Sequence, residues 1–313
     1  MINKQPSKIK MSSFQDKISM DACVRGLCKN QDVAFMGNSN LRGEHFDYGI
    51  IMDGHGSDEF ISYMKGLDWT YIVSCDDVWE QIYSILMTIN YLQGGSTLII
   101  MRAFINRIEV ISVGDSVILI HKNGELSFTN EKHTHNNPRE KERLKTVPSY
   151  HGMKKPTDYI PLIRNSNEMQ AIKSQYNYFG TDYNPRLHHL AMTQCLGHGN
   201  ITGYEPERHV EYFEENDLMH IVMGSDGLFD MLLLEKNVKT TPELTPTDLE
   251  DIQKDHIDIL TMNATELVEK VEQRWKKCDW SYHWHIKDYS KVMAPLSFNG
   301  EYDDISAITW RNY

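Results

Sequence analysis

The stretch DYGIIMDGHG, residues 47–56, places an apolar run of strand length directly before an Asp-Gly-His-Gly sequence. The run predicts a strand over Asp47–Met52, because its residues are typical of buried strands. Asp53 then lies at the end of a rigid element, and Gly54 lets the backbone itself approach an ion closely. This junction is therefore the first candidate for a functional site.

Two later stretches repeat the pattern of an acidic residue at the end of a strand. Asp226 follows the apolar run His220–Gly224, and Asp303 precedes the run Ile305–Trp310. Carboxylates are the ligands that hard divalent cations prefer, and strand ends hold them rigidly. Any one Asp-Gly pair is more often a simple turn. The prediction of a metal site therefore rests on the three carboxylates together and on their order along the chain.

Apolar periodicity also predicts the main elements of the fold. Further strands are expected over Ser96–Phe104, Ile108–Val113 and Val117–His121, and helices over Asp76–Leu92 and Ala264–Lys277. The strands come in antiparallel-type pairs, with helices inserted in long connections, which favours an α+β fold. No clear linker divides the chain, so we expect a single domain over residues 1–313.

Two regions lack a sustained period. Residues 147–187 are polar and rich in proline, and residues 236–258 are acidic and rich in threonine and proline. Long loops in compact domains tend to be functional or mobile. We therefore expect both regions to be irregular surface insertions in the domain.

The composition is that of an ordinary globular protein, with 40% hydrophobic and 24% charged residues. The formal net charge is −12, so the chain repels phosphate backbones and nucleic-acid binding is not expected. The five cysteines are scattered and give no disulfide framework. No apolar stretch reaches the ~20 residues that a membrane helix needs. We therefore expect a soluble intracellular protein, cytoplasmic or nuclear, with no membrane partner.

The motifs, taken in order, resemble the protein phosphatase 2C family of metal-dependent phosphatases, and the resemblance spans nearly the whole chain. The residues that carry it are Asn30-Gln31-Asp32, Asp53-Gly54-His55-Gly56, Gly95-Ser96-Thr97, Gly114-Asp115-Ser116, the segment from Phe128 to Arg143, Ser225-Asp226-Gly227-Leu228-Phe229-Asp230 and Asp303-Asp304-Ile305-Ser306. The resemblance implies two antiparallel sheets packed face to face, with helices on both outer faces. It also implies hydrolysis of phosphoserine and phosphothreonine in protein substrates, by a metal-activated water and without a phosphoenzyme.

The resemblance further implies a role for each site residue. Two Mg²⁺ or Mn²⁺ ions would be bridged by Asp53, with the carbonyl of Gly54 on the second ion and Asp226 and Asp303 on the first. Asp32 would orient metal-bound water or act as an outer ligand. His55 would give a proton to the leaving alkoxide, since histidine titrates near working pH. A third, weaker ion is expected near Glu131, whereas Thr97, Asp115 and Asp230 are interpreted as structural. The expected partner is a phosphoprotein substrate, and a monomer is favoured.

Several positions depart from the family pattern, namely Leu27, Gln31, Gln194 and His198. Leu27 stands where many members have an arginine that clamps the substrate phosphate, and His198 replaces an aspartate. Arg25 and Lys29 flank Leu27 and are the candidate substrate-binding residues, although a lysine cannot reproduce the bidentate fork of an arginine. The departures leave open an alternative, a weak or inactive pseudophosphatase that acts as a regulatory binding protein. Hydrolysis of a non-protein phosphoester is a third hypothesis.

Overall fold

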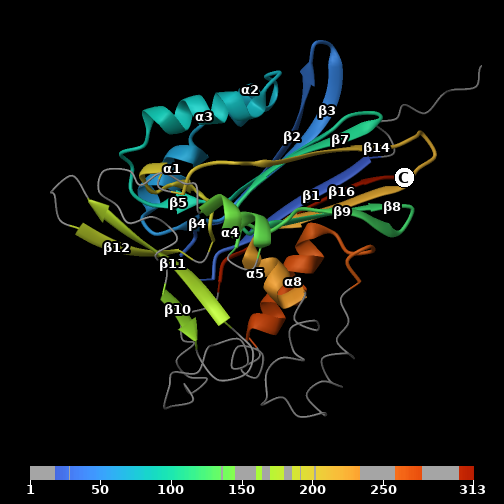
Figure 1. Ribbon diagram of the computed structural model, residues 1–313. Coiled ribbons are helices and arrows are strands. Elements are labelled where there is room, and N and C mark those ends of the chain that lie inside the picture. The colour runs from blue at the N-terminus through green and yellow to red at the C-terminus, as the bar shows by residue number, and fades with distance from the viewer. Residues whose placement is uncertain are drawn as a thin grey trace, which may run out of the picture.

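The fold is a sandwich of two five-stranded antiparallel sheets (Figure 1). The computed structural model describes residues 18–27, 29–134, 137–144, 160–163, 170–179, 185–190, 192–200, 202–232, 258–276 and 303–313. The first sheet has the order β1 (Ile18–Arg25), β16 (Ile305–Asn312), β15 (Met219–Gly224), β8 (Val117–Lys122) and β9 (Glu125–Thr129). The second has the order β14 (Glu207–Tyr212), β7 (Arg107–Val113), β6 (Leu98–Ala103), β3 (Glu44–Met52) and β2 (Val33–Leu41).

The inner faces of the two sheets form the central core. Alternate residues of each strand point inward, which is the periodicity that a half-buried or buried strand requires. Trp310 of β16 donates its indole N–H to Asp47 Oδ2 of β3 at 3.0 Å, and so links the two sheets. The apolar side chains of this layer include Ile51, Ile99, Met101, Ile120, Met223 and Ile308.

Helices cover both outer faces (Figure 1). Three of them, α1 (Asp58–Lys65), α2 (Trp69–Val73) and α3 (Val78–Thr88), pack on the sheet that contains β3, through residues such as Phe60, Ile72 and Ile82. Two others, α5 (Asp226–Leu232) and α8 (Ala264–Lys276), pack on the sheet that contains β16, through residues such as Leu228, Leu267 and Val271. The predicted α+β architecture, with two packed antiparallel sheets and helices outside both, is confirmed.

Two small sheets lie outside the sandwich. Strands β4 (Gly54–His55), β5 (Gly95–Ser96) and β13 (Leu196–Gly197) pair through β5 and are followed by the 3-10 turn η2 (His198–Asn200). Strands β10 (Ile160–Ile163), β11 (Gln170–Phe179) and β12 (Pro185–Leu190) form the other. The expectation that residues 147–187 are irregular is therefore wrong where these strands lie. Of residues 236–258, all but the last lie outside the described part of the chain.

The remaining described helix is α4 (Pro138–Leu144). None of the helices in the described ranges is long and apolar enough to cross a membrane.

Candidate active site

Strand register brings Asp32 and Asp53 together. Val33, the first residue of β2, pairs with Met52, the last residue of β3. Asp32 and Asp53 are the next residues outward on these two strands, so they lie beside each other at one end of the sandwich. Thr97 fixes Asp53 there: its hydroxyl accepts from the Asp53 N–H at 3.0 Å, and its own N–H donates to the Asp53 carbonyl at 2.9 Å.

The register of the other sheet brings Asp226 and Asp303 to the same end. Gly224, the last residue of β15, pairs with Ala307 near the start of β16. Asp226 follows the first strand and opens α5, and Asp303 precedes the second. Both carboxylates therefore stand where one strand ends and its neighbour begins.

The carboxylates act on one another electrostatically. Burial raises the pKa of Asp53 well above its ordinary value, and the nearby charges of Asp226, Asp32 and Asp303 raise it further. Burial raises the pKa of Asp303 to about 8, with added repulsion from Asp226 and Asp32. The pKa of Asp32 is raised to about 7, first by burial and then by the charges of Asp226 and Asp304, while the hydroxyls of Ser225 and Ser306 lower it. The sequence-predicted aspartates thus form one cluster of mutually repelling acids.

Several carboxylate oxygens in the cluster have no hydrogen-bond partner among the described residues. They are Asp32 Oδ2, Asp226 Oδ1 and Asp115 Oδ1, all buried. A buried polar atom without a partner is costly, and a buried charge more so. Divalent cations with oxygen ligands would satisfy these atoms and offset the repulsion, so the donor set fits Mg²⁺ or Mn²⁺.

Asp115 belongs to this cluster, although the sequence suggested only a structural role. Its residue type and its place after Gly114 are those of an ordinary turn. In the fold it lies two residues before the strand β8, whose Val117 pairs with Gly224. Burial raises the pKa of Asp115 to about 7, and the charge of Asp226 adds to the shift. The sequence signal that could have identified it is the one used for Asp53, an acidic residue at a strand end.

Asp304 holds the loop that precedes Asp32. Its Oδ1 accepts from the Leu27 N–H and its Oδ2 from the Gln31 N–H, both at 2.8 Å. The Gln31 amide in turn donates to the Gly56 carbonyl at 3.2 Å and to Asp58. Asp304 thus fixes this loop through backbone hydrogen bonds.

The two candidate substrate-binding cations lie in different surroundings. Arg25 forms an ion pair with Glu272 of α8, at 3.1 Å between Nε and Oε2. Lys29 is exposed. Its positive charge lowers the pKa of His55 and partly offsets the rise in the pKa of Asp303. Of these two candidate cations, Lys29 is therefore the one that acts on the acidic cluster, whereas Arg25 is engaged by α8.

Glu131 takes part in surface contacts. It pairs with Arg139 at 3.4 Å and accepts from the Asn137 amide at 3.2 Å. Nothing in this geometry tests the third ion expected near Glu131, which stays a prediction.

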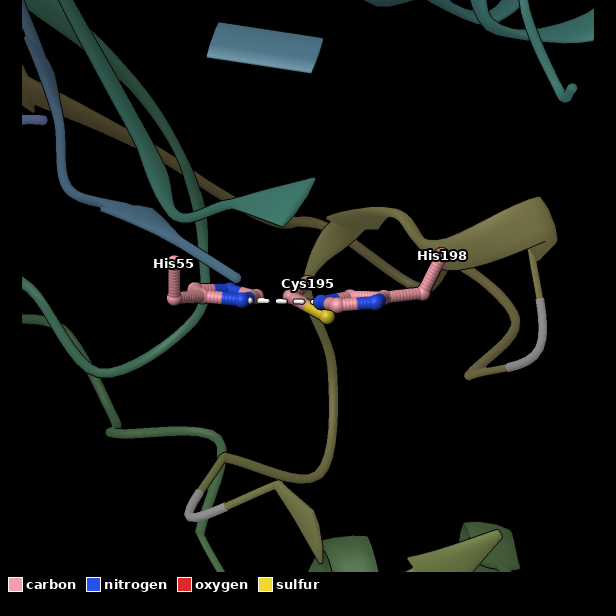
Figure 2. Close-up of side chains that lie close together, drawn as sticks. All are labelled: His55, Cys195 and His198. Atoms are coloured by element: carbon pink, nitrogen blue, oxygen red, sulfur yellow. Dashed lines mark hydrogen bonds between the residues drawn. The ribbon is translucent and has the colours of Figure 1, made fainter. Parts of the chain in front are cut away.

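His55 lies on β4, next to the carboxylates. Its Nδ1 is 2.8 Å from Nε2 of His198, and the two ring planes differ by 9° (Figure 2). Its Nε2 is buried without a hydrogen-bond partner among the described residues. Burial lowers the pKa of His55 to about 4, and the charge of Lys29 lowers it further. The sequence-based argument that His55 titrates near working pH does not hold in this environment, where the imidazole is neutral at pH 7.

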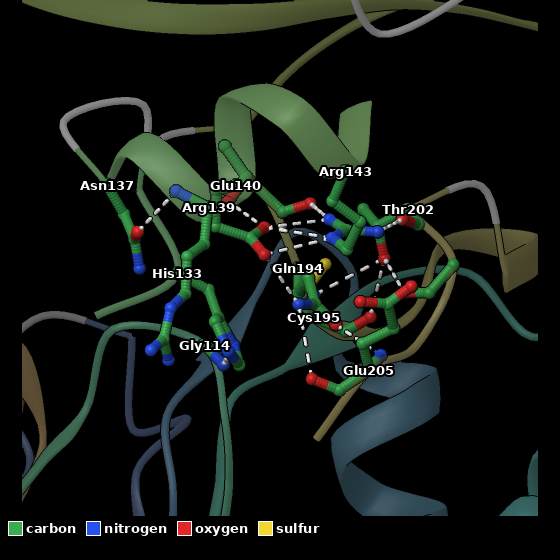
Figure 3. A network of polar contacts seen from close by, with 12 residues as sticks. Gly114, His133, Asn137, Arg139, Glu140, Arg143, Gln194, Cys195, Thr202 and Glu205 are labelled. Carbon is green, nitrogen blue, oxygen red and sulfur yellow. Dashed lines mark hydrogen bonds and ion pairs between the residues drawn. The ribbon is translucent and has the colours of Figure 1, made fainter. Parts of the chain in front are cut away.

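A buried polar network holds Gln194, which lies four residues before His198 in the sequence (Figure 3). Arg143 of α4 pairs with Glu140 at 2.8 Å, with side chains only 6% and 5% exposed, and donates to the carbonyls of Thr193 and Thr202 at 2.8 and 2.7 Å. Gln194 donates to Glu140 Oε1 at 2.9 Å. Gln194, which departs from the resembled pattern, is therefore hydrogen-bonded within this network.

The comparisons with known proteins agree with this arrangement. Residues 29–155 match the family model described as Protein phosphatase 2C. The solved structure of serine-threonine phosphatase 2C from Toxoplasma gondii is similar in fold, with a TM-score of 0.51 over 95% of each chain at 13% sequence identity. This match covers less than half of the chain, and over residues 29–155 the chain resembles the protein phosphatase 2C family. The resemblance expected from the sequence motifs is confirmed over this segment, and the low identity to the solved structure is that of a divergent relative.

Other solved structures are less similar. A sex-determining protein of C. elegans is 16% identical with a TM-score of 0.49, and the match covers 94% of this chain but 64% of the worm chain. The catalytic domain of the phosphatase PstP, solved with two manganese ions, is 15% identical with a TM-score of 0.40, over 94% of this chain and 97% of PstP. No curated protein matches the sequence. The family model ends before Asp226 and Asp303, so the case for these two residues comes from the geometry.

Proposed function

We propose that this chain is an active, metal-dependent protein serine/threonine phosphatase of the protein phosphatase 2C family. One observation carries the proposal: Asp32, Asp53 and Asp303, which come from distant parts of the sequence, have raised pKa values at one end of the sandwich, and the charge of Asp226 contributes to each rise. Natural folds rarely gather buried acids without a cation partner. Perturbed acids of this kind are typical of functional sites.

The proposed ligands are the side chains of Asp53, Asp226 and Asp303 and the main-chain carbonyl of Gly54, with Asp32 outside them, for two Mg²⁺ or Mn²⁺ ions. Such ions, when bound, lower the pKa of water and offset charge on a phosphoryl group. The chain's part is to hold the carboxylates in place. The hydroxyls of Ser225 and Ser306 favour the charged form of Asp32.

His55 and Lys29 act on the substrate in this proposal. His55 presents its unpartnered Nε2, and a proton held there can be donated to the leaving serine or threonine oxygen. A neutral imidazole can serve as such a donor, so the lowered pKa of His55 is compatible with the role. The Lys29 ammonium attracts the phosphate dianion. The Cys195 thiol has no part, since burial raises its pKa to about 12.

The test is hydrolysis of a phosphothreonine peptide by the purified full chain with Mn²⁺. We expect turnover that EDTA abolishes and that Asp226→Asn reduces at least 100-fold, on the order of the loss expected for a metal ligand. Asp76→Asn is the matched control, because Asp76 is an exposed partner of Arg42 outside the cluster. Turnover that persists in EDTA, or an equal loss in both variants, would contradict the proposal.

The pairing of Arg25 with Glu272 favours a second candidate, an inactive regulatory binding protein. With Leu27 at the clamp position and Arg25 engaged elsewhere, Lys29 alone would bind the phosphate. Calorimetric titration with Mn²⁺ separates the two functions. Stoichiometric Mn²⁺ binding together with no turnover on any phosphopeptide of a panel supports the regulator, and turnover supports the phosphatase.

A further inference from the structure

The contact between His55 and His198 joins residues that are 143 positions apart in the sequence. Two imidazole nitrogens at 2.8 Å must share one proton, because two lone pairs would repel each other at that distance. Either His55 donates from Nδ1 or His198 donates from Nε2. The first choice leaves a neutral His55 with a bare Nε2, and the second leaves the proton of His55 on Nε2.

The small sheet β4-β5-β13 sets this distance. Gly95 of β5 pairs with His55 of β4 on one side and with Gly197 of β13 on the other. His198 directly follows Gly197, so the two histidines are held on either side of β5. The N–H of His198 donates to the Gly94 carbonyl at 2.8 Å. The positions of both rings are therefore fixed by the backbone.

The ring of His198 also fills a space that only glycines leave open. A Cβ on Gly95 would lie 2.5 Å from His198 Cδ2 and 2.8 Å from Nε2, and one on Gly56 would lie 3.4 Å from Cε1. His198 itself has φ 48°, a conformation that is uncommon for a residue with a side chain. Strained backbone persists where the surroundings hold it, and it clusters at functional sites.

The same two histidines and Cys195 have ligand atoms within 4.8 Å of one another, which raises the alternative of a metal site. A tetrahedral ion needs ligand atoms that converge on one point. The two rings instead lie nearly in one plane with their nitrogens facing each other along one line (Figure 2). The Cys195 thiol stays protonated, because burial raises its pKa to about 12. The arrangement is that of a hydrogen bond.

We propose that His198 is a positioning residue, whose Nε2–H donates to His55 Nδ1 and keeps the proton of His55 on Nε2, facing the substrate. The inference rests on the proposed function, since it is the proposed proton donation from His55 that makes its tautomer matter. It goes beyond that function in giving the position that departs from the family pattern a defined role. His198 would then orient His55 through a hydrogen-bond donor, at a position where the resembled pattern has an acid.

The direct test reads the tautomer by NMR on the full chain, labelled with ¹⁵N-histidine and treated with EDTA. Signals of His55 are assigned by their loss in His55→Gln. We expect Nε2 of His55 to carry the proton and Nδ1 to have the shift of an unprotonated nitrogen, and we expect His198→Leu to populate both tautomers. A protonated Nδ1 in the wild-type chain overturns the proposal, and so does an unchanged single tautomer in His198→Leu.

Kinetics with Mn²⁺ and a phosphothreonine peptide give the second readout. His198→Leu should lower kcat about tenfold, a part of the ~10²–10⁴ that a proton donor contributes, with KM changed less than about twofold. His198→Gln, whose amide can donate from nearly the same place, should restore kcat to within about threefold of wild type. His209→Leu is the control, because His209 likewise contacts one ring, that of Phe128, but lies on β14.

The two proposals fail in different ways. No turnover in the wild-type chain contradicts the proposed phosphatase activity, while the NMR arm still decides the role of His198. Turnover in the wild type with equal kcat in His198→Leu overturns the role of His198 and leaves the phosphatase standing.

Discussion

Arg25 and Glu272 form an ion pair that joins the end of β1 to α8, with 3.1 Å between Arg25 Nε and Glu272 Oε2. The pair is half exposed on the arginine side, at 47%. It follows that Arg25 serves the packing of α8 against the sheet, and that of the two candidate substrate-binding cations Lys29 is the one left near the carboxylates.

Replacing these two cations should therefore have different effects. Lys29→Gln should raise KM for a phosphopeptide about three- to tenfold, because it removes a point charge near the substrate phosphate. Arg25→Gln should leave KM unchanged and lower the free energy of unfolding by about 0–1 kcal/mol, as for other exposed pairs. Steady-state kinetics and urea denaturation measure the two quantities. A larger KM effect from Arg25→Gln would contradict the assignment.

Removing one carboxylate should stabilise the metal-free chain. Asp226 raises the pKa values of Asp53 and Asp303 by repulsion, so Asp226→Asn relieves that repulsion and should raise the Tm in EDTA by a few degrees, roughly 2–4 °C per kcal/mol for a chain of this size. The same variant should lose the stabilisation that Mn²⁺ gives the wild type, which is about 2.7 kcal/mol at 100 times Kd. Thermal melts with and without Mn²⁺ measure both. A lower Tm in EDTA would count against the cluster.

Stability without metal should fall as pH rises from 7 to 8.5. The pKa of Asp303 is about 8 in the fold, raised from 3.8 mainly by burial. Over this window the unfolded chain has already lost that proton, whereas the folded chain still holds it, so each step upward in pH favours unfolding. The buried histidines add little there, because their pKa values lie at or below the ordinary 6.5 in both states.

Urea denaturation in EDTA at several pH values measures this slope. Asp303→Asn should make it shallower, and saturating Mn²⁺ should remove it, since bound cations keep the carboxylates ionised. A stability that rises from pH 7 to 8.5 in EDTA would show that the cluster is not protonated.

Breaking the buried Glu140–Arg143 pair should be severe. Arg143→Met leaves the Glu140 carboxylate buried without its partner and should cost about 3–5 kcal/mol of unfolding free energy. Arg42→Met removes an ion pair with side chains 78% and 60% exposed and should cost about 0–1 kcal/mol. Urea denaturation of both variants tests the contrast. Equal small losses would mean that the network does not support the segment before His198.

Much of the sandwich was predictable because its central strands are apolar and continuous. The runs predicted over Asp47–Met52 and Ile108–Val113 are β3 and β7 with one to three residues added at the start. The run predicted over Ser96–Phe104 is divided by Thr97, which bonds to Asp53 instead of continuing the ladder. Strands β1 and β2 were not predicted. β2 carries glycine and asparagine at an edge of its sheet, where strand propensity is weak.

The acidic residues of the site were predictable, but their surroundings were not. Asp53, Asp226 and Asp303 could be named because each adjoins an apolar run. The neutral state of His55 and its contact with His198 depend on the register of β4, β5 and β13, which are two residues long and carry no sequence period. The engagement of Arg25 depends on the position of α8, which is likewise a matter of packing.

The hydrogen bonds that Asp304 accepts from Leu27 and Gln31 join residues that are 277 and 273 positions apart in the sequence. During synthesis on the ribosome, the loop before Asp32 therefore has no anchor until residues 303–312 have emerged, and β1 lacks its only neighbour in the described sheet, β16. Any cations would then be captured only after residues 303–312 have emerged, and a nascent chain stalled before Asp303 would have the carboxylates of Asp53 and Asp226 without that of Asp303.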